Sequence, residues 1–333
     1  MNTESTTPLI SIVIPAHNAA ATIEECLEAC LAQSYPNTEV IVIDDGSTDN
    51  TTALSAPFPI RCIRQNQQGP AAARNRGAHE ASGEFLVFTD SDCVPAEDWL
   101  EQLMQGFDEG VVAVGGTYGI ADDESLLARM IHEEIQCRHE TFGEFVDFLG
   151  SFNLAVRKSA FLECGGFDES FRAASGEDND LSYRLLDTGG KLRFTGEAVV
   201  FHYHPTRLRR YLRTQMRHGF WRMKLYAKHP HRMRGDRYAG ITDLLAPVLM
   251  LLLGLSFFLV LLGPPAPFYI GVVAGMLLTL VAVRLPVPWK MFLRTRDRRM
   301  LGFVGVMLIR DVARAIGMAQ GIWTFRVLRK STA

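Results

Sequence analysis

The chain carries the stretch VIVIDDGSTD at residues 40–49, in which four aliphatic residues run directly into two aspartates. An unbroken aliphatic run of this length is typical of a strand that is buried on both faces of a parallel sheet. The pattern recurs in FLVFTDSD at residues 85–92, and LISIVIPAHN at residues 9–18 supplies another buried strand. Because ligands bind at the carboxyl ends of parallel strands, we expect both groups of aspartates to lie in one site.

Segments with helical periodicity separate these strands. Apolar residues recur at helical spacing between residues 23 and 31, and Thr22 with Glu25 has the spacing of a capping box at the start of that helix. We expect further helices at residues 70–81 and 99–107, and further strands at residues 60–63 and 111–114. Strands that alternate with helices predict an α/β domain built on a mostly parallel, Rossmann-like sheet.

The composition separates this domain from the rest of the chain. The 333 residues are 47% hydrophobic with a formal net charge of -3, but after about residue 240 the apolar residues gather in two long runs. Six scattered cysteines form no CxxC pair, which favours a reducing compartment. Residues 1–8 are polar and have neither the basic nor the apolar part of a signal peptide, so we predict that no signal peptide is cleaved.

The two apolar runs cover residues 241–262 and 267–285, and both approach the length of roughly 20 residues that a membrane-spanning helix needs. We predict a transmembrane hairpin, and a buried helical hairpin in a soluble domain is the alternative. Basic residues crowd the stretches 207–237 and 290–299 outside the hairpin, whereas the connecting loop has none. The positive-inside rule therefore predicts that both ends, and the α/β domain, face the cytoplasm.

Two further segments are predicted to lie at the membrane surface. Residues 301–325 are apolar but contain Arg310, Asp311 and Arg314, so we expect an interfacial helix rather than a third span. Residues 206–238 combine helical apolar spacing with many arginines, which predicts a basic amphipathic helix on the inner leaflet or, alternatively, a solvated helix. The predicted domains are therefore an α/β domain at residues 1–205, a surface segment at 206–238 and a membrane region at 239–333.

Asp90 and Asp92 are the first candidates for chemistry. Residues two apart in an extended chain point to the same side, so both carboxylates can face one hard cation such as Mg²⁺ or Mn²⁺. Taken alone, the pair would favour a simple turn after a strand. Neither a P-loop nor a glycine-rich dinucleotide loop is present. A bound nucleotide must therefore have its phosphates held by a metal and by side chains, of which Arg74 is a candidate.

His202 and His204 follow a predicted extended segment, so their imidazoles point the same way. Either is a candidate third metal ligand, and a structural or surface role is the alternative.

Taken together, these motifs resemble those of the family 2 glycosyltransferases with the GT-A fold. The resemblance covers roughly residues 9–219 and rests on the order and spacing of SIVIPAHN at residues 11–18, VIDDGSTD at 42–49, ARNRG at 73–77, FTDSD at 88–92, Asn153, GGFDE at 165–169 and GEDNDL at 176–181. The apolar segments that follow resemble the membrane segments of bacterial envelope members of the family.

The resemblance implies a donor site for a nucleotide-sugar. Its nucleotide contacts are expected from Pro15, Asn18, Asp44, Asp45, Arg74 and Asp90. Asp45, together with Asp44, is expected to read the base, usually uracil, and Asp90 to contact the ribose or the metal. Asp92 is expected to ligate Mg²⁺ or Mn²⁺, with His202 or His204 as a further ligand, as in many GT-A enzymes.

The resemblance also implies an acceptor side, with Asn153 and Asp180, and makes Asp178 the general base, with Glu177 as the alternative. A carboxylate that stays ionised near neutral pH can accept the proton of the acceptor as the new bond forms. Acidic residues are also favourable in the first turn of a helix, which is the alternative explanation for Asp178 and Asp180.

We therefore predict an inverting glycosyltransferase that moves a sugar by direct displacement from a nucleotide-sugar, with a UDP-sugar as the first candidate. The acceptor is expected to be a lipid or lipid-linked envelope glycan, because the predicted anchor places the site at the inner membrane, and no nucleic-acid partner is expected. The QxxRW signature of processive members is absent, since Gln215 is followed by MRHG. The alternatives are a nucleotidyltransferase that makes a nucleotide-sugar, and a non-catalytic membrane subunit that binds one.

Overall fold

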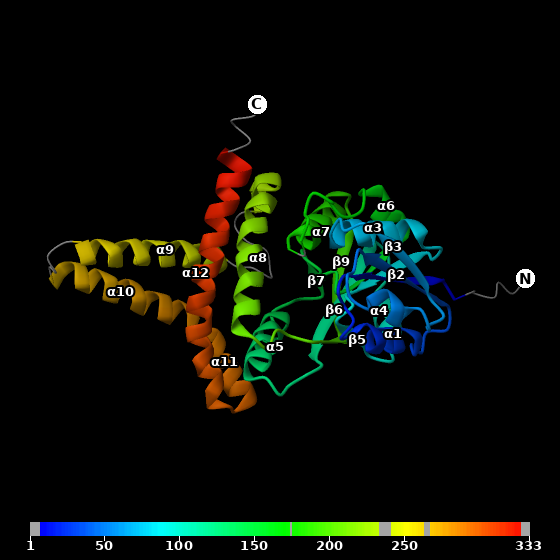
Figure 1. Ribbon diagram of the computed structural model, residues 1–333, viewed down its shortest axis with the longest axis horizontal. Coiled ribbons are helices and arrows are strands. Elements are labelled where there is room, and N and C mark those ends of the chain that lie inside the picture. The colour runs from blue at the N-terminus through cyan, green and yellow to red at the C-terminus, as the bar shows by residue number, and fades with distance from the viewer. Residues whose placement is uncertain (1–6, 174, 233–240, 263–266, 328–333) are drawn as a thin grey trace, which may run out of the picture. The chain divides into compact units, whose positions relative to one another are not determined.

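The computed structural model describes residues 7–173, 175–232, 241–262 and 267–327. They form two compact units, and Figure 1 labels most of their elements. The first unit comprises Met1–Asp123 and Phe142–His204, and the second comprises Glu124–Thr141 and Pro205–Ala333. The chain therefore contributes one segment to the second unit before the first unit is complete.

Within the described residues of the first unit, nine strands form one sheet with the order β3-β2-β1-β4-β8-β6-β9-β5, and β7 pairs with β9. The strands are β1 (Ile10–Ala16), β2 (Thr38–Asp45), β3 (Arg61–Gln65), β4 (Phe85–Thr89), β5 (Cys93–Pro95), β6 (Val111–Ile120), β7 (Phe145–Val146), β8 (Asn153–Arg157) and β9 (Lys191–His202). The four neighbours β3-β2-β1-β4 are parallel, whereas β8 runs antiparallel to β4 and β6. The predicted α/β class is confirmed, with a mixed sheet whose parallel half carries both groups of aspartates.

The aliphatic runs are buried because helices cover both faces of this sheet. Along β1, Ile12 and Ile14 belong to one apolar core and Val13 to the other. The first core also takes side chains from α1 (Ile23–Leu31), α2 (Thr51–Ser55) and α4 (Trp99–Gln105), and the second from α3 (Pro70–Glu80), α6 (Lys158–Glu163) and α7 (Glu177–Asp187). Gly77 lets α3 approach β1 closely, because a Cβ at that position would lie 2.3 Å from Val13 Cγ1.

The predicted capping box at the start of α1 is wrong. Thr22 occupies the N-cap position, but its hydroxyl donates to the Ser91 carbonyl at 2.8 Å and makes no capping hydrogen bond. Glu25 instead accepts a hydrogen bond from the Tyr203 hydroxyl. The reason is tertiary, since residues 90–92 lie against the start of α1 and Cys26 Sγ contacts the Asp90 carbonyl at 3.5 Å. The start of α1 thus supports the acidic segment.

The second unit is helical. It contains α5 (Leu126–His139), α8 (Leu208–Lys228), α9 (Ile241–Leu262), α10 (Pro267–Arg284), α11 (Pro286–Thr295) and α12 (Phe303–Ile322), with short 3₁₀ helices at Pro230–Arg232 and Arg298–Gly302 and a short π-helix at Trp323–Val327. Helix α8 packs on α12, α9 on α10 and α5 on α11. The contact of α8 with α12 is close, because a Cβ at Gly317 would lie 1.9 Å from the Met216 carbonyl oxygen.

Charged side chains that interrupt the apolar helices of the second unit pair with one another. The pairs join α5, α9, α10 and α12: Arg284–Asp311 at 2.7 Å, Arg310–Glu134 at 2.6 Å, Arg138–Asp243 at 3.0 Å and Arg314–Asp243 at 3.1 Å. Burying a charge is costly unless a partner compensates it. These pairs therefore explain how α12 carries three charges in the middle of an apolar sequence.

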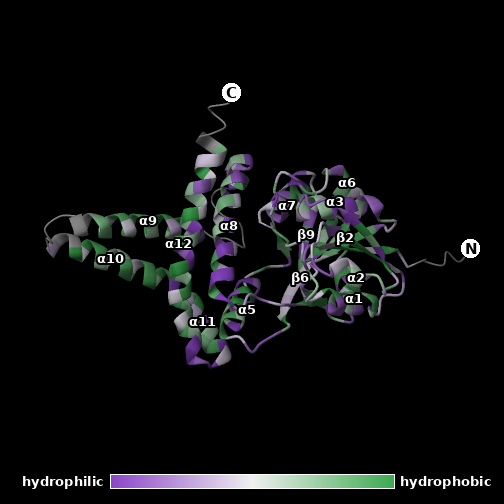
Figure 2. Cartoon of the chain, viewed as in Figure 1, coloured by the Kyte–Doolittle hydropathy of each residue, from purple (hydrophilic) through white to green (hydrophobic). Residues whose placement is uncertain are grey.

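Within the described residues, no single helix is both long and apolar enough to cross a membrane. One bent pair, Ile270–Arg284 followed at 40° by Pro286–Thr295, meets that requirement by length and composition, and the described apolar part of α9 is the shorter stretch Thr242–Phe258. Figure 2 shows apolar residues along both α9 and α10. The predicted hairpin segments are helical, whereas the predicted loop at 263–265 and residues 233–240 lie outside the described residues.

Candidate functional site

Asp44, at the end of β2, holds the loop that follows it. Its carboxylate is fully buried and accepts hydrogen bonds from the Ser47 N–H at 2.8 Å and from the Thr52 hydroxyl. Burial alone would raise the pKa of Asp44, but these hydrogen bonds outweigh it and lower that pKa. Asp44 is thus ionised, and its hydrogen bonds stabilise the loop that follows β2.

Asp45 is held by the loop that joins β3 to α3. Its Oδ1 accepts hydrogen bonds from Gln65 Nε2 and from the Gln68 N–H, both at 2.8 Å, and its Oδ2 accepts one from the Gly69 N–H at 2.7 Å. These donors lie some twenty positions farther along the chain. The position of the Asp45 carboxylate therefore depends on the conformation of the loop between β3 and α3.

Asn18 links the loop after β1 to the loop after β2. It adopts a left-handed backbone conformation with φ 54°, which Asn tolerates better than most residues. Its N–H donates to the Ser47 hydroxyl at 3.0 Å, and its side-chain oxygen accepts from the Thr48 N–H at 2.8 Å. Pro15 is partly exposed in β1. His17, to which the sequence assigned no role, contacts the Asp45 carbonyl through Nδ1 at 2.9 Å.

Arg74 lies buried at the centre of the site, 2% exposed. From α3, its Nη2 donates to Asp90 Oδ1 at 2.6 Å and its Nη1 to Glu177 Oε1 at 3.4 Å. The guanidinium also lies over the Phe167 ring, 5.5 Å from its centroid. Although burial acts to lower the pKa of Arg74, the surrounding carboxylates raise it above its ordinary value. Arg74 therefore joins the segment after β4 to the start of α7 as a permanent cation.

Asp92 and His202 are brought together by strand pairing. Cys93 in β5 lies directly opposite His202 in β9, and this register places Asp92 Oδ2 3.6 Å from His202 Nε2. One ligand atom from each of Asp92, Cys93 and His202 falls within 4.8 Å of the others. His204 is nearly buried, and its Nδ1 lies 3.0 Å from His202 Nδ1. Of the two predicted histidines, His202 is therefore the one beside Asp92.

These groups fit a divalent cation. A carboxylate oxygen and an imidazole nitrogen are ordinary metal ligands, whereas burial raises the pKa of the Cys93 thiol, which keeps its proton and makes it a poor ligand. The carboxylates of Asp90 and Asp178 face the guanidinium of Arg74, and Asp92 adds a further carboxylate beside His202. The site therefore has an excess of negative charge that a divalent ion would balance.

The two acids that begin α7 have different surroundings. Glu177 is buried and also accepts a hydrogen bond from the Ser175 N–H at 2.6 Å. Burial, and next the charge of Asp178, raise the pKa of Glu177 to about 8. Asp178 is partly exposed; burial raises its pKa as well, but Arg74 and hydrogen bonds from the side chain and backbone of Ser151 oppose that rise. Glu177, with its pKa of about 8, therefore keeps its proton at neutral pH, whereas Arg74 and Ser151 favour the charged form of Asp178.

Two predicted acceptor-side residues have structural partners. Asn153 is buried, accepts a hydrogen bond from Trp99 Nε1 at 2.8 Å and donates to the carbonyls of Thr117 and Ala198 at 3.0 and 2.9 Å. Asp180 is fully buried and forms an ion pair with Arg184 at 2.8 Å. The structure therefore places both beneath the site surface, where Asn153 ties three strands together.

Ser151 and Gln65 are site residues that sequence reasoning missed. Ser151 hydrogen-bonds to Asp178, and Gln65 hydrogen-bonds to Asp45. Both partners are distant in the sequence, so no local pattern marks either contact. The one usable signal for Gln65 is its place at the carboxyl end of β3, beside the strand end that carries Asp45.

Sequence comparisons identify relatives of this chain. The family model described as Glycosyl transferase family 2 matches residues 11–163. A pre-mycofactocin glycosyltransferase of Mycobacterium tuberculosis is 31% identical over 239 residues, which cover 67% of this chain and 48% of that protein. Glycosyltransferase AglE of Haloferax volcanii is 33% identical over 216 residues, covering 60% of this chain and 68% of the relative. The chain thus spans about half the length of the first of these curated relatives.

The fold also has a counterpart among solved structures. A mannosyltransferase from Pyrobaculum calidifontis, solved in complex with GDP-Man and Mn²⁺, matches with a TM-score of 0.61 and 19% identity over 97% of this chain and 89% of that chain. At this identity the match establishes the fold alone, a GT-A-like α/β architecture.

Replacing Glu177 with glutamine should change how stability depends on pH. In the unfolded chain the carboxyl loses its proton near its ordinary pKa, whereas folded Glu177 keeps the proton up to about pH 8. The wild-type protein therefore loses free energy of unfolding as the pH rises between these values. Because E177Q cannot titrate, its stability relative to wild type should improve by up to about 1.4 kcal/mol per pH unit in that window.

Chemical unfolding at a series of pH values measures this difference. The control is E163Q, the same substitution at an exposed glutamate of α6. The prediction is contradicted if the difference in free energy of unfolding between E177Q and wild type varies with pH no more than the difference between E163Q and wild type.

Proposed function

Because the chain belongs to glycosyl transferase family 2, we propose that it transfers a sugar from a nucleotide-sugar to an acceptor hydroxyl, with inversion at the anomeric carbon. One observation carries the proposal: the buried Arg74 guanidinium bonds a donor-side carboxylate, Asp90, and the acceptor-side acid Glu177. A transferase must bring two substrates to one carbon atom, and Arg74 fixes the groups expected to bind each of them within one small space.

In the proposed reaction the acceptor oxygen attacks the anomeric carbon while the bond from that carbon to the diphosphate oxygen breaks. Asp178 accepts the proton of the acceptor, and the nucleoside diphosphate leaves with the electron pair of the broken bond. Asp178 suits this role because it is partly exposed, Arg74 and Ser151 favour its charged form, and its buried Oδ1 has no hydrogen-bond partner among the described residues. Glu177, bonded to Arg74 and Ser175, keeps this turn of α7 in place.

Asp92 and His202 would hold a divalent ion, with Asp90 beside them. Such an ion neutralises charge on a diphosphate leaving group. An imidazole ligand favours Mn²⁺ over Mg²⁺, which prefers an all-oxygen shell. On the nucleotide side, Asp45 is proposed to accept a hydrogen bond from an N–H of the base, with a UDP-sugar as the first candidate donor.

The first test is release of a nucleoside diphosphate by the purified chain in detergent from a panel of UDP-, GDP- and TDP-sugars. We expect release from one donor with Mn²⁺, its loss in EDTA and its return when Mn²⁺ is added back. The D92N variant should need at least about tenfold more Mn²⁺ for half-maximal release. The control is D98N, which alters an exposed aspartate outside the site. Undiminished release of the nucleoside diphosphate in EDTA would contradict the proposed role of the metal.

The assignment of the base is tested by comparing D178N with E177Q. The D178N variant removes the proton acceptor, so its kcat should fall by about 10²- to 10⁴-fold. The E177Q variant replaces a group that is already neutral, so its kcat should stay within about tenfold of wild type. Steady-state kinetics on the donor identified above measures both. The reverse order of losses would assign the base to Glu177.

We further propose that α9 and α10 anchor the chain in the inner membrane, with the first unit in the cytoplasm. Residues 244–283 contain no charge, and the two charges that bound them, Asp243 and Arg284, pair with each other at 3.3 Å. Apolar side chains on both helices are exposed, including Leu252 and Leu278. Basic residues flank the hairpin on both sides, which favours a cytoplasmic location of its ends. Such an anchor favours a lipid or lipid-linked acceptor.

Extraction of membranes with alkaline carbonate tests the anchor. The wild-type chain should stay in the pellet. Leu252→Arg combined with Leu278→Arg should move it to the supernatant, because each arginine near the middle of a span costs about 2.5–3.5 kcal/mol. Leu162→Arg, at an exposed leucine of α6, is the control and should stay in the pellet. A wild-type chain found in the supernatant would refute the anchor.

A further inference from the structure

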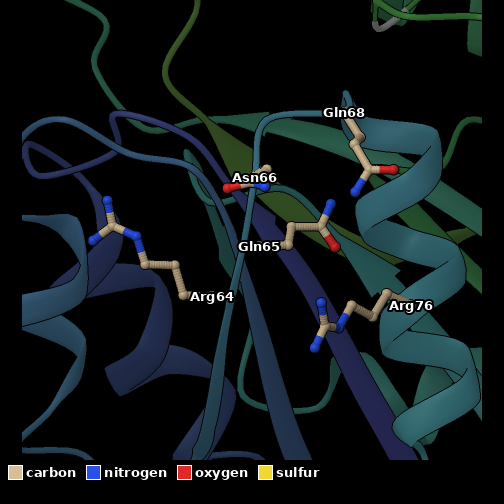
Figure 3. A pocket seen from close by; sticks show the side chains of 5 residues that line it. All are labelled: Arg64, Gln65, Asn66, Gln68 and Arg76. Atoms are coloured by element: carbon tan, nitrogen blue, oxygen red, sulfur yellow. The ribbon is translucent and has the colours of Figure 1, made fainter.

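The loop that holds Asp45 has an outer face that the proposed function does not use. On this face lies a hollow of about 500 Å³, lined by Arg64, Gln65, Asn66, Gln68 and Arg76 (Figure 3). Because β3 is the edge strand of the sheet, the hollow lies at the border of the first unit. Its volume falls within the range of about 300–1,000 Å³ that is usual for small-molecule sites.

The lining is polar and positively charged. It consists of two guanidinium groups and three carboxamides, without a carboxylate or an apolar side chain. Arg64 is anchored, since its Nη2 donates to the Ser47 carbonyl at 2.7 Å and its Nη1 lies 3.8 Å from the buried Asp44. Arg76 is exposed on α3 and belongs to no ion pair or hydrogen bond within the described part of the chain. Arg76 is therefore the group with unused binding capacity.

Figure 3 shows how these side chains lie. The head groups of Gln65 and Arg76 face each other across the space between β3 and α3, with Gln68 at the start of α3, while Arg64 projects on the other side of the strand. Gln65 thus has two neighbours, because its Nε2 donates to Asp45 and its oxygen remains on the side of Arg76.

We propose that this hollow binds a small hydroxylated phosphate of the sugar phosphate class, and that its occupancy is coupled to the nucleotide site through the loop of residues 65–69. A guanidinium pairs with phosphate through two parallel hydrogen bonds. The carboxamides can both donate to and accept from hydroxyl groups. An apolar or cationic ligand would find no complementary partner in this lining.

The coupling follows from shared residues, and it rests on the proposed role of Asp45 at the nucleotide. Gln65 and Gln68 line the hollow and also donate the hydrogen bonds that hold Asp45. The loop is closely packed, since a Cβ at Gly46 would lie 2.9 Å from the Gln67 nitrogen. A ligand that displaces either glutamine therefore changes the position of Asp45, and nucleotide binding changes affinity at the hollow by the same factor.

Calorimetry on the full chain in detergent and EDTA tests the site itself, because EDTA removes metal-dependent binding at the donor site. Glucose 1-phosphate is the probe, with inorganic phosphate and glucose as separate arms. We expect glucose 1-phosphate to bind more tightly than phosphate, and glucose not to bind. R76Q should weaken binding of glucose 1-phosphate by about 10- to 100-fold, the value of a charge-assisted hydrogen bond.

The matched control is R61Q, which alters an arginine of β3 that lies outside the hollow and pairs with Glu80 at 2.8 Å. R61Q should bind like wild type. The site is refuted if wild type shows no binding or if R76Q binds as tightly as R61Q. Equal affinities for phosphate and glucose 1-phosphate would overturn the sugar part of the proposal.

The coupling is tested by measuring UDP and GDP affinity in Mn²⁺, with and without saturating glucose 1-phosphate. We expect the affinity for one of them to change by about fivefold or more in wild type and R61Q. The change should disappear in R76Q, whose nucleotide affinity without glucose 1-phosphate should match wild type. An unchanged affinity in wild type would overturn the coupling, whereas absence of any nucleotide binding would instead contradict the proposed donor site.

Discussion

The buried guanidinium of Arg74 is the interaction on which the candidate site depends. A buried cation is costly unless carboxylates compensate it, and breaking such a pair from one side costs about 3–5 kcal/mol. The Asp90 carboxylate compensates this charge, and Glu177 accepts a further hydrogen bond from the same guanidinium, so both groups must come together around α3 when the first unit folds. This requirement fixes the segment after β4 relative to the start of α7, which the sequence separates by almost ninety positions. The two halves of the site are consequently one structural feature rather than two motifs that happen to be neighbours.

The sequence predicted the strand ends because their burial pattern is local. An aliphatic run that is covered on both faces has one physical solution, a central strand, and polar residues then follow where the strand leaves the core. β2 and β4 both pair with β1 in parallel, so the prediction that Asp45 and Asp90 share one edge of the sheet is confirmed. That His202 or His204 would join Asp92 was expected for a different reason, the family resemblance, and the register of β5 with β9 places His202 beside Asp92.

Contacts between distant segments could not be predicted. Thr22 has the right local spacing for a capping box, yet its hydroxyl bonds Ser91, because the tertiary partner competes with the local one. The role of α5 was equally hidden. Its segment showed no motif, and Glu134 reveals its function only when Arg310 of α12 is placed against it. A lone acid on a helix gives no indication of whether it will be solvated or will close a buried ion pair.

The electrostatics of the site separate the proposed transferase from its two rivals. A nucleotidyltransferase must hold a triphosphate, which carries more charge than the diphosphate of a nucleotide-sugar, and Arg74, already bonded to Asp90 and Glu177, adds no free positive charge for it. A subunit that only binds a nucleotide-sugar gains nothing from an acceptor-side group whose burial lowers the free energy of unfolding. Burial of Glu177 with a raised pKa opposes folding at neutral pH, and perturbed acids of this kind gather where chemistry requires them. Here the neighbouring Asp178 is partly exposed, and Arg74 and Ser151 favour its charged form, which is the form that a general base requires.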